Sequence, residues 1–107
     1  MRNIGDLMKK AQSVQTQMNI LQNKMEMQEF TGEAAGGNVK VTMTGKGVPV
    51  KIEIDKSLVN PDDVETLEDV ILVALKDVKE KTEAAMNEGM MKIQSSLGLP
   101  PGFKMPF

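Results

Sequence analysis

The side chains available for chemistry in this chain are amines, one guanidinium group, carboxylates, amides and hydroxyls. The 107 residues contain no His and no Cys. This composition excludes His-assisted nucleophilic catalysis, thiol chemistry, disulfides and the usual zinc sites. Carboxylates remain for acid–base work, but no pair of them converges on an identifiable pocket. We therefore expect a protein that is not an enzyme, uses no cofactor or metal and has no small-molecule substrate.

Basic residues in two stretches are the candidates for a binding function. In residues 1–24, four basic residues accompany a single acid, Asp6, which gives this stretch a net charge of +3. Residues 38–59 carry a net charge of +2. Lys and Arg at such positions bind the phosphates of duplex DNA. The candidate DNA contacts are Arg2, Lys9, Lys10 and Lys24 in the first stretch, and Lys40, Lys46 and Lys51 in the second.

The total charge points away from nucleic acid, because the whole chain carries −2 and has an acidic composition. The acid is concentrated, however, in residues 60–89, which carry −6. Charges are screened over about 8 to 10 Å, so the local charge decides what binds. The distribution disfavours binding by the whole surface and leaves binding by one face open. The alternative is that the first stretch, with its many Gln and Asn side chains, is only a solvated helix flank.

The first basic stretch lies in a predicted helix over residues 4–28. Its apolar residues follow a heptad, and this period is typical of a coiled-coil seam. At 1.5 Å per residue the helix would be about 37 Å long, whereas a 100-residue globule has a radius of gyration near 13 Å. The helix must overhang its domain or pack on another chain, although an ordinary core helix remains the alternative. The predicted homodimer seam comprises Leu7, Ala11, Val14, Met18, Leu21 and Met25.

The second basic stretch lies in a predicted β-hairpin over residues 38–55, with its turn at residues 45–47. Alternation places Val39, Val41 and Met43 on one face of the first strand, and Val48, Val50, Ile52 and Ile54 on one face of the second. We expect helices to cover this apolar face. A third short strand fits residues 30–34.

A second long helix is predicted to start at Asn60, as N-cap, with Pro61 in the first turn and to run to about Gly89. Residues 89–97 form a short helix or a continuation of it. The acidic residues at its start favour a cap and a solvated face over a metal site. They are Asp62, Asp63, Glu65, Glu68 and Asp69.

Residues 98–107 form a predicted tail, because three of the five prolines lie there and exclude a regular helix. The tail also holds Phe103 and Phe107, so it is either a disordered terminus or a segment that docks on a partner. We expect one α+β dimerising domain over residues 1–97: a long N-terminal helix, a small antiparallel sheet of two to three strands and a second long helix. No signal peptide or membrane span is visible, which predicts a cytoplasmic protein with no membrane partner.

Several blocks of this sequence occur together, in this order, in one known family. They are residues 7–12 with the Gln- and Met-rich run to residue 28, then residues 32–37, 39–45, 52–55 and 63–69, and the terminal decapeptide 98–107. On these blocks the chain resembles the YbaB/EbfC family of bacterial nucleoid-associated proteins. The resemblance implies a homodimer shaped like tweezers that binds duplex DNA, alters its conformation and contributes to nucleoid organisation and gene regulation. It transfers no individual DNA-contacting residue. Judged from the residues alone, a protein-interaction adaptor that uses the coiled-coil seam and the tail is the alternative function.

Overall fold

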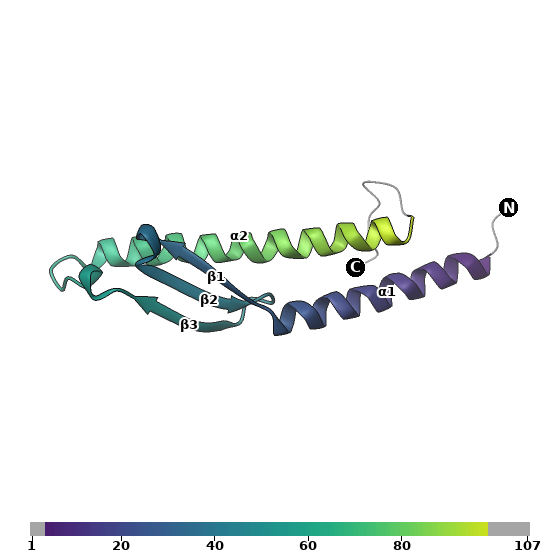
Figure 1. Cartoon of the computed structure of the whole chain (residues 1–107), viewed down its shortest axis with the longest axis horizontal. Helices are drawn as coiled ribbons and strands as arrows, with labels where there is room; N and C mark the ends of the chain where they lie inside the picture. The colour runs from purple at the N-terminus through teal and green to yellow at the C-terminus, as the bar shows by residue number, and fades with distance from the viewer. Residues whose placement is uncertain (1–3, 99–107) are drawn as a thin grey trace.

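The computed structural model describes residues 4–98 (Figure 1). In the chain, one long helix precedes a three-stranded sheet and a second long helix follows it. The molecule is elongated, with extents of 71 × 23 × 18 Å and a radius of gyration of 19.5 Å. The predicted overhanging α+β architecture is therefore confirmed. The elements are α1 (Ile4–Met27), β1 (Glu29–Ala34), η1 (Ala35–Gly37), β2 (Val39–Thr44), β3 (Pro49–Ile54), η2 (Lys56–Leu58) and α2 (Val64–Ser96).

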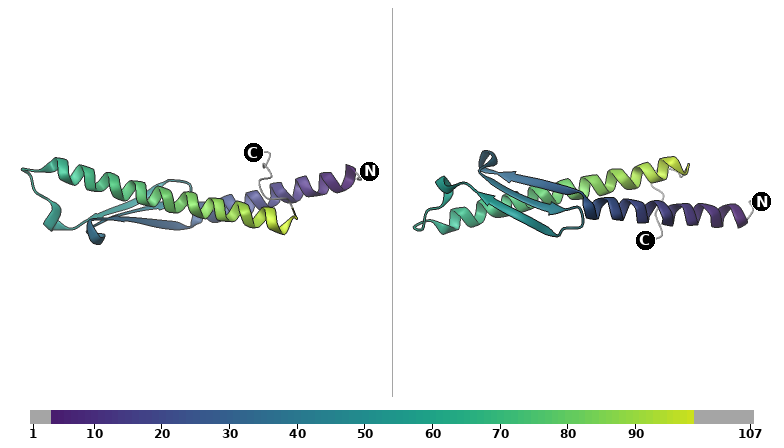
Figure 2. Two further views of the ribbon diagram at one scale, coloured as in Figure 1. Left: turned by 90° about the horizontal axis from the view of Figure 1, so that it is seen from above. Right: turned by 60° about the horizontal axis from the view of Figure 1, so that its bottom comes forward.

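The sheet is antiparallel with the strand order β1-β2-β3, so β2 is its central strand. Helix α2 lies across one face of the sheet (Figure 2). Its cover rests mainly on β1 and β2. A sheet–helix cluster forms there from five buried residues: Ala34, Val39, Val41, Ala74 and Val78.

Close backbone approach holds the sheet–helix cluster together at Gly32 of β1. A Cβ atom added at Gly32 would lie 2.3 Å from the Ala74 carbonyl oxygen and 2.4 Å from the Val78 nitrogen. A residue with a side chain therefore cannot occupy this position without displacing α2. The glycine allows helix and sheet backbones to touch, which explains its place inside a strand.

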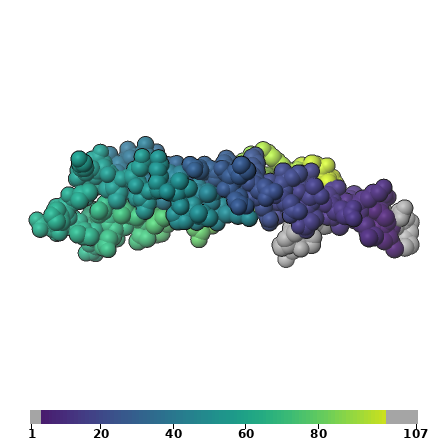
Figure 3. Space-filling view, turned by 90° about the horizontal axis from the view of Figure 1, so that it is seen from below, coloured from purple at the N-terminus to yellow at the C-terminus, as the bar shows by residue number. Residues whose placement is uncertain are grey.

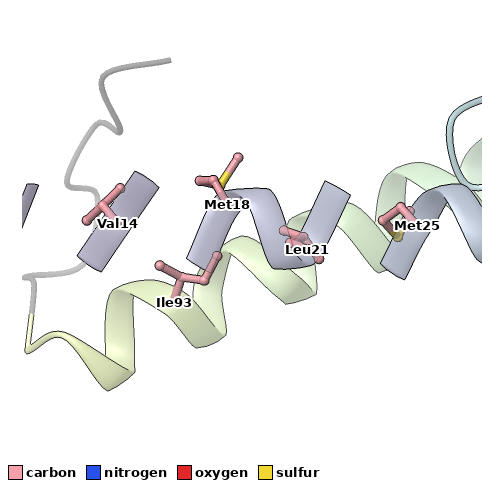
Figure 4. Close-up of a cluster of buried hydrophobic side chains, with 5 residues drawn as sticks. All are labelled: Val14, Met18, Leu21, Met25 and Ile93. Atoms are coloured by element: carbon pink, nitrogen blue, oxygen red, sulfur yellow. The ribbon is translucent and has the colours of Figure 1, made fainter. Parts of the chain in front are cut away.

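Helix α1 packs against the C-terminal half of α2 in the antiparallel direction (Figures 1 and 4). The helix–helix cluster consists of Val14, Met18, Leu21 and Met25 from α1 and Ile93 from α2. Phe30 packs against both this cluster and the sheet–helix cluster, so it links the two. At the base of α1, the Gly45 amide donates to the carbonyl oxygens of Met25 at 2.8 Å and Gln28 at 3.0 Å. These bonds tie the end of α1 to the end of β2.

The N-terminal end of α2 differs from the sequence prediction, whereas its C-terminal end matches the predicted alternative of a continuation past Gly89. The N-cap is Asp63, whose carboxylate accepts from the Thr66 amide, whereas Asn60 accepts from the Asp62 amide in the preceding turn. The helix also continues through Gly89 to Ser96 as one element. Gly89 lies against the Leu21 side chain, and Ile93 beyond it is buried on α1. Packing on α1 therefore stabilises a helical glycine that by itself disfavours the helix.

The apolar face of β3 is not covered as the alternation led us to expect. Ile52 and Ile54 pair with Val41 and Val39, so their side chains share the sheet face on which α2 lies. Ile52 is nevertheless 53% exposed and Val50 is 46% exposed. A single helix, α2, covers this face of the sheet, and it lies over β1 and β2. The apolar residues of the edge strand β3 therefore remain uncovered.

Candidate nucleic-acid interface

The lysines of α1 lie on a helix that projects past the end of α2 (Figure 3). We call residues 4–13 of α1 the arm. Lys9 and Lys10 lie on the arm and Lys24 lies near the base of α1; all three are exposed. Within residues 4–98, none of the ion pairs involves these three lysines. Their charges are therefore available to a ligand. Arg2, the fourth candidate of this stretch, lies outside the described residues.

Helical geometry places these lysines on one side of α1. A turn of 3.6 residues corresponds to about 100° per residue, and Lys9, Lys10 and Lys24 then fall within a sector of about 100°. On the same count the buried residues of the helix–helix cluster occupy the adjoining sector, and Lys10 lies at its border. Lys10 and Lys24 are separated by about 21 Å along the axis. This row of cations is long enough to contact several phosphates of one duplex, which carries one charge per 1.7 Å or so.

The lysines of the hairpin have acidic neighbours. Lys46 Nζ lies 3.6 Å from Glu26 Oε2, and Lys51 Nζ lies 3.7 Å from Glu53 Oε1. Lys40 stands between two acids in register, Glu33 on β1 and Glu53 on β3. The outer sheet face therefore mixes charges of both signs, and it is a weaker candidate for phosphate contact than α1. The role of Lys40, Lys46 and Lys51 in DNA binding stays a prediction.

Helix α2 is acidic, and three of its four lysines pair with acids of the same helix. Lys79 pairs with Glu83, Lys92 with Glu88, and Lys81 with Asp77. The acids at its start, including Asp63 with its capping role, lie at the end of the molecule far from the arm (Figure 1). No group of three or more acidic side chains within the described range is placed to hold a metal ion. The cap and the solvated face account for this cluster.

One carboxylate of α2 is specifically bound to the sheet. Asp77 Oδ2 accepts from the Glu33 amide at 2.9 Å and lies 3.2 Å from Lys81 Nζ. Lys81 in turn donates to the Thr31 carbonyl oxygen at 2.8 Å. The Glu33 amide, with help from Lys81, holds the pKa of Asp77 below its ordinary value. These bonds join α2 to β1 and belong to the fold rather than to a catalytic site.

The predicted dimer seam divides into two parts in the single chain. Val14, Met18, Leu21 and Met25 are buried against α2, whereas Leu7 and Ala11 on the arm are exposed. A second chain is not needed to explain the four buried members, which behave as the core helix that was the alternative interpretation. The seam of a homodimer therefore stays a prediction.

The sequence interpretation missed the open edge of the sheet as an interaction surface. Val50, Ile52 and Ile54 are its apolar residues. A hollow between the hairpin turn and α2, near the start of β3, is lined by residues that include Met43, Gly47, Leu75 and Thr82, with Lys46, Lys79 and Glu83 also present. The alternation of β3 had identified the face, but only the position of α2 shows that it lacks cover.

Among residues 4–98, no helix is long and apolar enough to cross a bilayer.

Comparison with known proteins adds an independent line of evidence. The model of the YbaB/EbfC DNA-binding family matches residues 1–97. A nucleoid-associated protein of Paramagnetospirillum magneticum is 51% identical, and one of Rhodospirillum centenum is 48% identical, each over 100% of both chains. The crystal structure of the uncharacterized protein HP0035 from Helicobacter pylori has a TM-score of 0.74 at 22% identity, covering 87% of this chain and 98% of that one. This last match shows a shared fold.

Proposed function

The chain belongs to the YbaB/EbfC DNA-binding family, which is not a family of enzymes, and from this premise we propose that it binds duplex DNA as a homodimer through α1. The observation that carries the proposal is the pair of unpaired lysines on the arm, Lys9 and Lys10. Two relatives are named nucleoid-associated proteins. By extension, this chain acts at the nucleoid, alters the conformation of DNA and contributes to gene regulation.

The open edge of the sheet supports the homodimer. Ile52 and Ile54, on the sheet face that α2 partly covers, are 53% and 37% exposed, and Val50, in the irregular part of β3 before them, is 46% exposed. An exposed sheet edge is also a template for pairing with another chain. We therefore place the contact between protomers at β3 and the neighbouring hollow, in preference to the buried part of the α1 seam. Two copies joined there present two arms.

Binding by α1 predicts a steep and specific dependence on salt. Each phosphate contact contributes about 0.9 to the slope of log K against log salt. A dimer in which Lys9→Gln and Lys10→Gln are combined loses four such contacts, so the slope falls by about 3.6. No compact set of arginines reads base edges, and we expect weak sequence preference.

The test is fluorescence anisotropy of a labelled duplex across a salt series. A matched control combines Lys76→Gln and Lys79→Gln on α2, which removes the same charge from another part of the molecule. We expect the control to keep most of the slope. An equal loss in both variants would show that total charge, and not α1, determines binding. Salt-independent binding would contradict phosphate contact altogether.

The dimer contact has a separate test by light scattering. Ile52→Glu puts a charge on the open apolar face, and we expect it to halve the measured mass. Lys51→Glu introduces the same carboxylate one residue away, on the opposite face of the sheet, and should leave the mass unchanged. A wild-type monomer at micromolar concentration would refute the homodimer.

A further inference from the structure

The apolar stripe of α1 is covered only as far as α2 extends. Met25, Leu21, Met18 and Val14 form its buried part. The same stripe continues along the arm through Ala11, Leu7 and Ile4, which are all exposed; Ile4 is 64% exposed and Leu7 57%. Burial thus stops at a point in the stripe where the sequence pattern does not change. The cause is the end of α2 at Ser96.

The chain leaves α2 at the place where this cover ends. Because the helices are antiparallel, α2 runs toward the N-terminal end of α1 (Figure 2). Leu97, just after α2, packs against the helix–helix cluster that contains Val14. In the sequence, residues 99–107 therefore follow directly after residues that pack where the uncovered part of the stripe begins.

The composition and length of residues 99–107 suit them to this stripe. Every second to fourth residue is a large apolar one: Leu99, Phe103, Met105 and Phe107. An extended proline-rich segment of nine residues spans about 28 Å, whereas Val14 and Ile4 are about 15 Å apart along α1. Proline-rich segments dock on apolar surfaces with little loss of conformational entropy.

We propose that residues 99–107 dock along the arm of the same chain and cover Ala11, Leu7 and Ile4. The attachment at Gly98 favours the same chain as occupant, because it holds the segment at a high effective concentration beside the stripe. The arm would then be a helix supported along its length, and Lys104 would join Lys9 and Lys10 on it. This contact is independent of the proposed DNA binding and of the proposed dimer contact at β3.

A single tryptophan reports on the docking, since the chain has no Trp of its own. In the full chain with Phe103→Trp, we expect blue-shifted emission and weaker quenching by acrylamide than in the denatured chain. Adding Leu7→Ser should shift the emission to the red and restore quenching. The matched control is Ile20→Ser, which alters an equally exposed residue, 56%, on another side of α1. It should leave the emission unchanged.

Two outcomes would overturn the proposal. Emission that is already solvent-like in Phe103→Trp, with a normal circular dichroism spectrum, would show that the segment does not dock. The second outcome concerns the identity of the chain. If the Phe103→Trp, Leu7→Ser chain is refolded with an excess of wild-type chain and its emission returns to the blue, the segment docks on a second copy. Emission that stays red under these conditions supports docking within one chain.

Discussion

The two buried clusters of this molecule are built from different kinds of residue. The sheet–helix cluster uses valine and alanine, and Val39, Ala74 and Val78 have no exposed surface. The helix–helix cluster includes long unbranched side chains, with Met18 and Met25 buried in it and Met86 and Met90 packed against it. Valine is stiff at its first torsion angle, whereas methionine adapts its shape to its surroundings. The sheet and α2 therefore form a fixed body, and α1 is attached to it by a more accommodating contact.

The largest loss of stability that would test this difference between the clusters is expected from substituting the glycines at which the elements touch, Gly32 and Gly89. In Gly32→Ala the new Cβ meets backbone atoms of α2 at 2.3 and 2.4 Å, so the helix must move. We expect a loss of about 3 kcal/mol or more in the free energy of unfolding. Urea denaturation followed by circular dichroism measures it.

The matched variant in the other cluster is Gly89→Ala. Its Cβ would meet Leu21 Cδ1 at 2.5 Å, the end of a flexible side chain. Alanine also favours a helix by about 1 kcal/mol over glycine. We expect the two terms nearly to cancel. A loss equal to that of Gly32→Ala would mean that both contacts are equally rigid.

A smaller effect should separate the two clusters when side chains are exchanged. Val41→Leu adds a methylene to a residue that is 1% exposed, and overpacking of this kind costs about 2 kcal/mol. Met25→Leu, at 2% exposure, exchanges two residues of similar volume and should cost less than about 1.5 kcal/mol. Calorimetry of the two variants gives the comparison. The reverse order of costs would contradict the adaptable character of the helix–helix cluster.

The smallest effect concerns the carboxylate that joins β1 to α2. Because the pKa of Asp77 is lowered in the folded chain, its stabilising contribution is present above the ordinary carboxylate pKa and is lost as the pH falls through the lowered value. We expect Asp77→Asn to reduce the melting temperature at pH 7, and the difference from wild type to shrink below about pH 4. Glu80→Gln, which removes another carboxylate of α2, should not reproduce this pH dependence.

Local patterns in the sequence predicted the elements well because each pattern has a local cause. The heptad of residues 4–28 and the alternation around Val41 predicted α1 and the hairpin. The patterns did not reveal which partner buries each face. The same heptad residues that suggested a second chain, such as Leu21, pack on α2, and this depends on α2 continuing past Gly89. A glycine reads locally as a stop, and only the tertiary contact with Leu21 explains why it is not one.

The candidate site was predictable in part for a similar reason. Charge along the sequence identified both basic stretches, including Lys9 and Lys46. The sequence could not show which lysine charges are neutralised by distant acids. Lys46 pairs with Glu26, and the end of α1, β1 and β2 lie between them in the chain. The exposure of the apolar face around Ile52 likewise could be recognised only once the position of α2 was known. Spatial pairing, rather than residue type, distinguishes the stronger candidates from the weaker.

The bonds from the Gly45 amide to the Met25 and Gln28 carbonyls place a fulcrum at the base of α1. The helix beyond it is a lever about 36 Å long. A rotation of roughly 10° at this fulcrum would carry the tip through about 6 Å, close to the rise of two base pairs at about 3.4 Å each. A small rotation at this fulcrum would thus be magnified, at the tip of the arm, into a displacement on the scale of neighbouring phosphates.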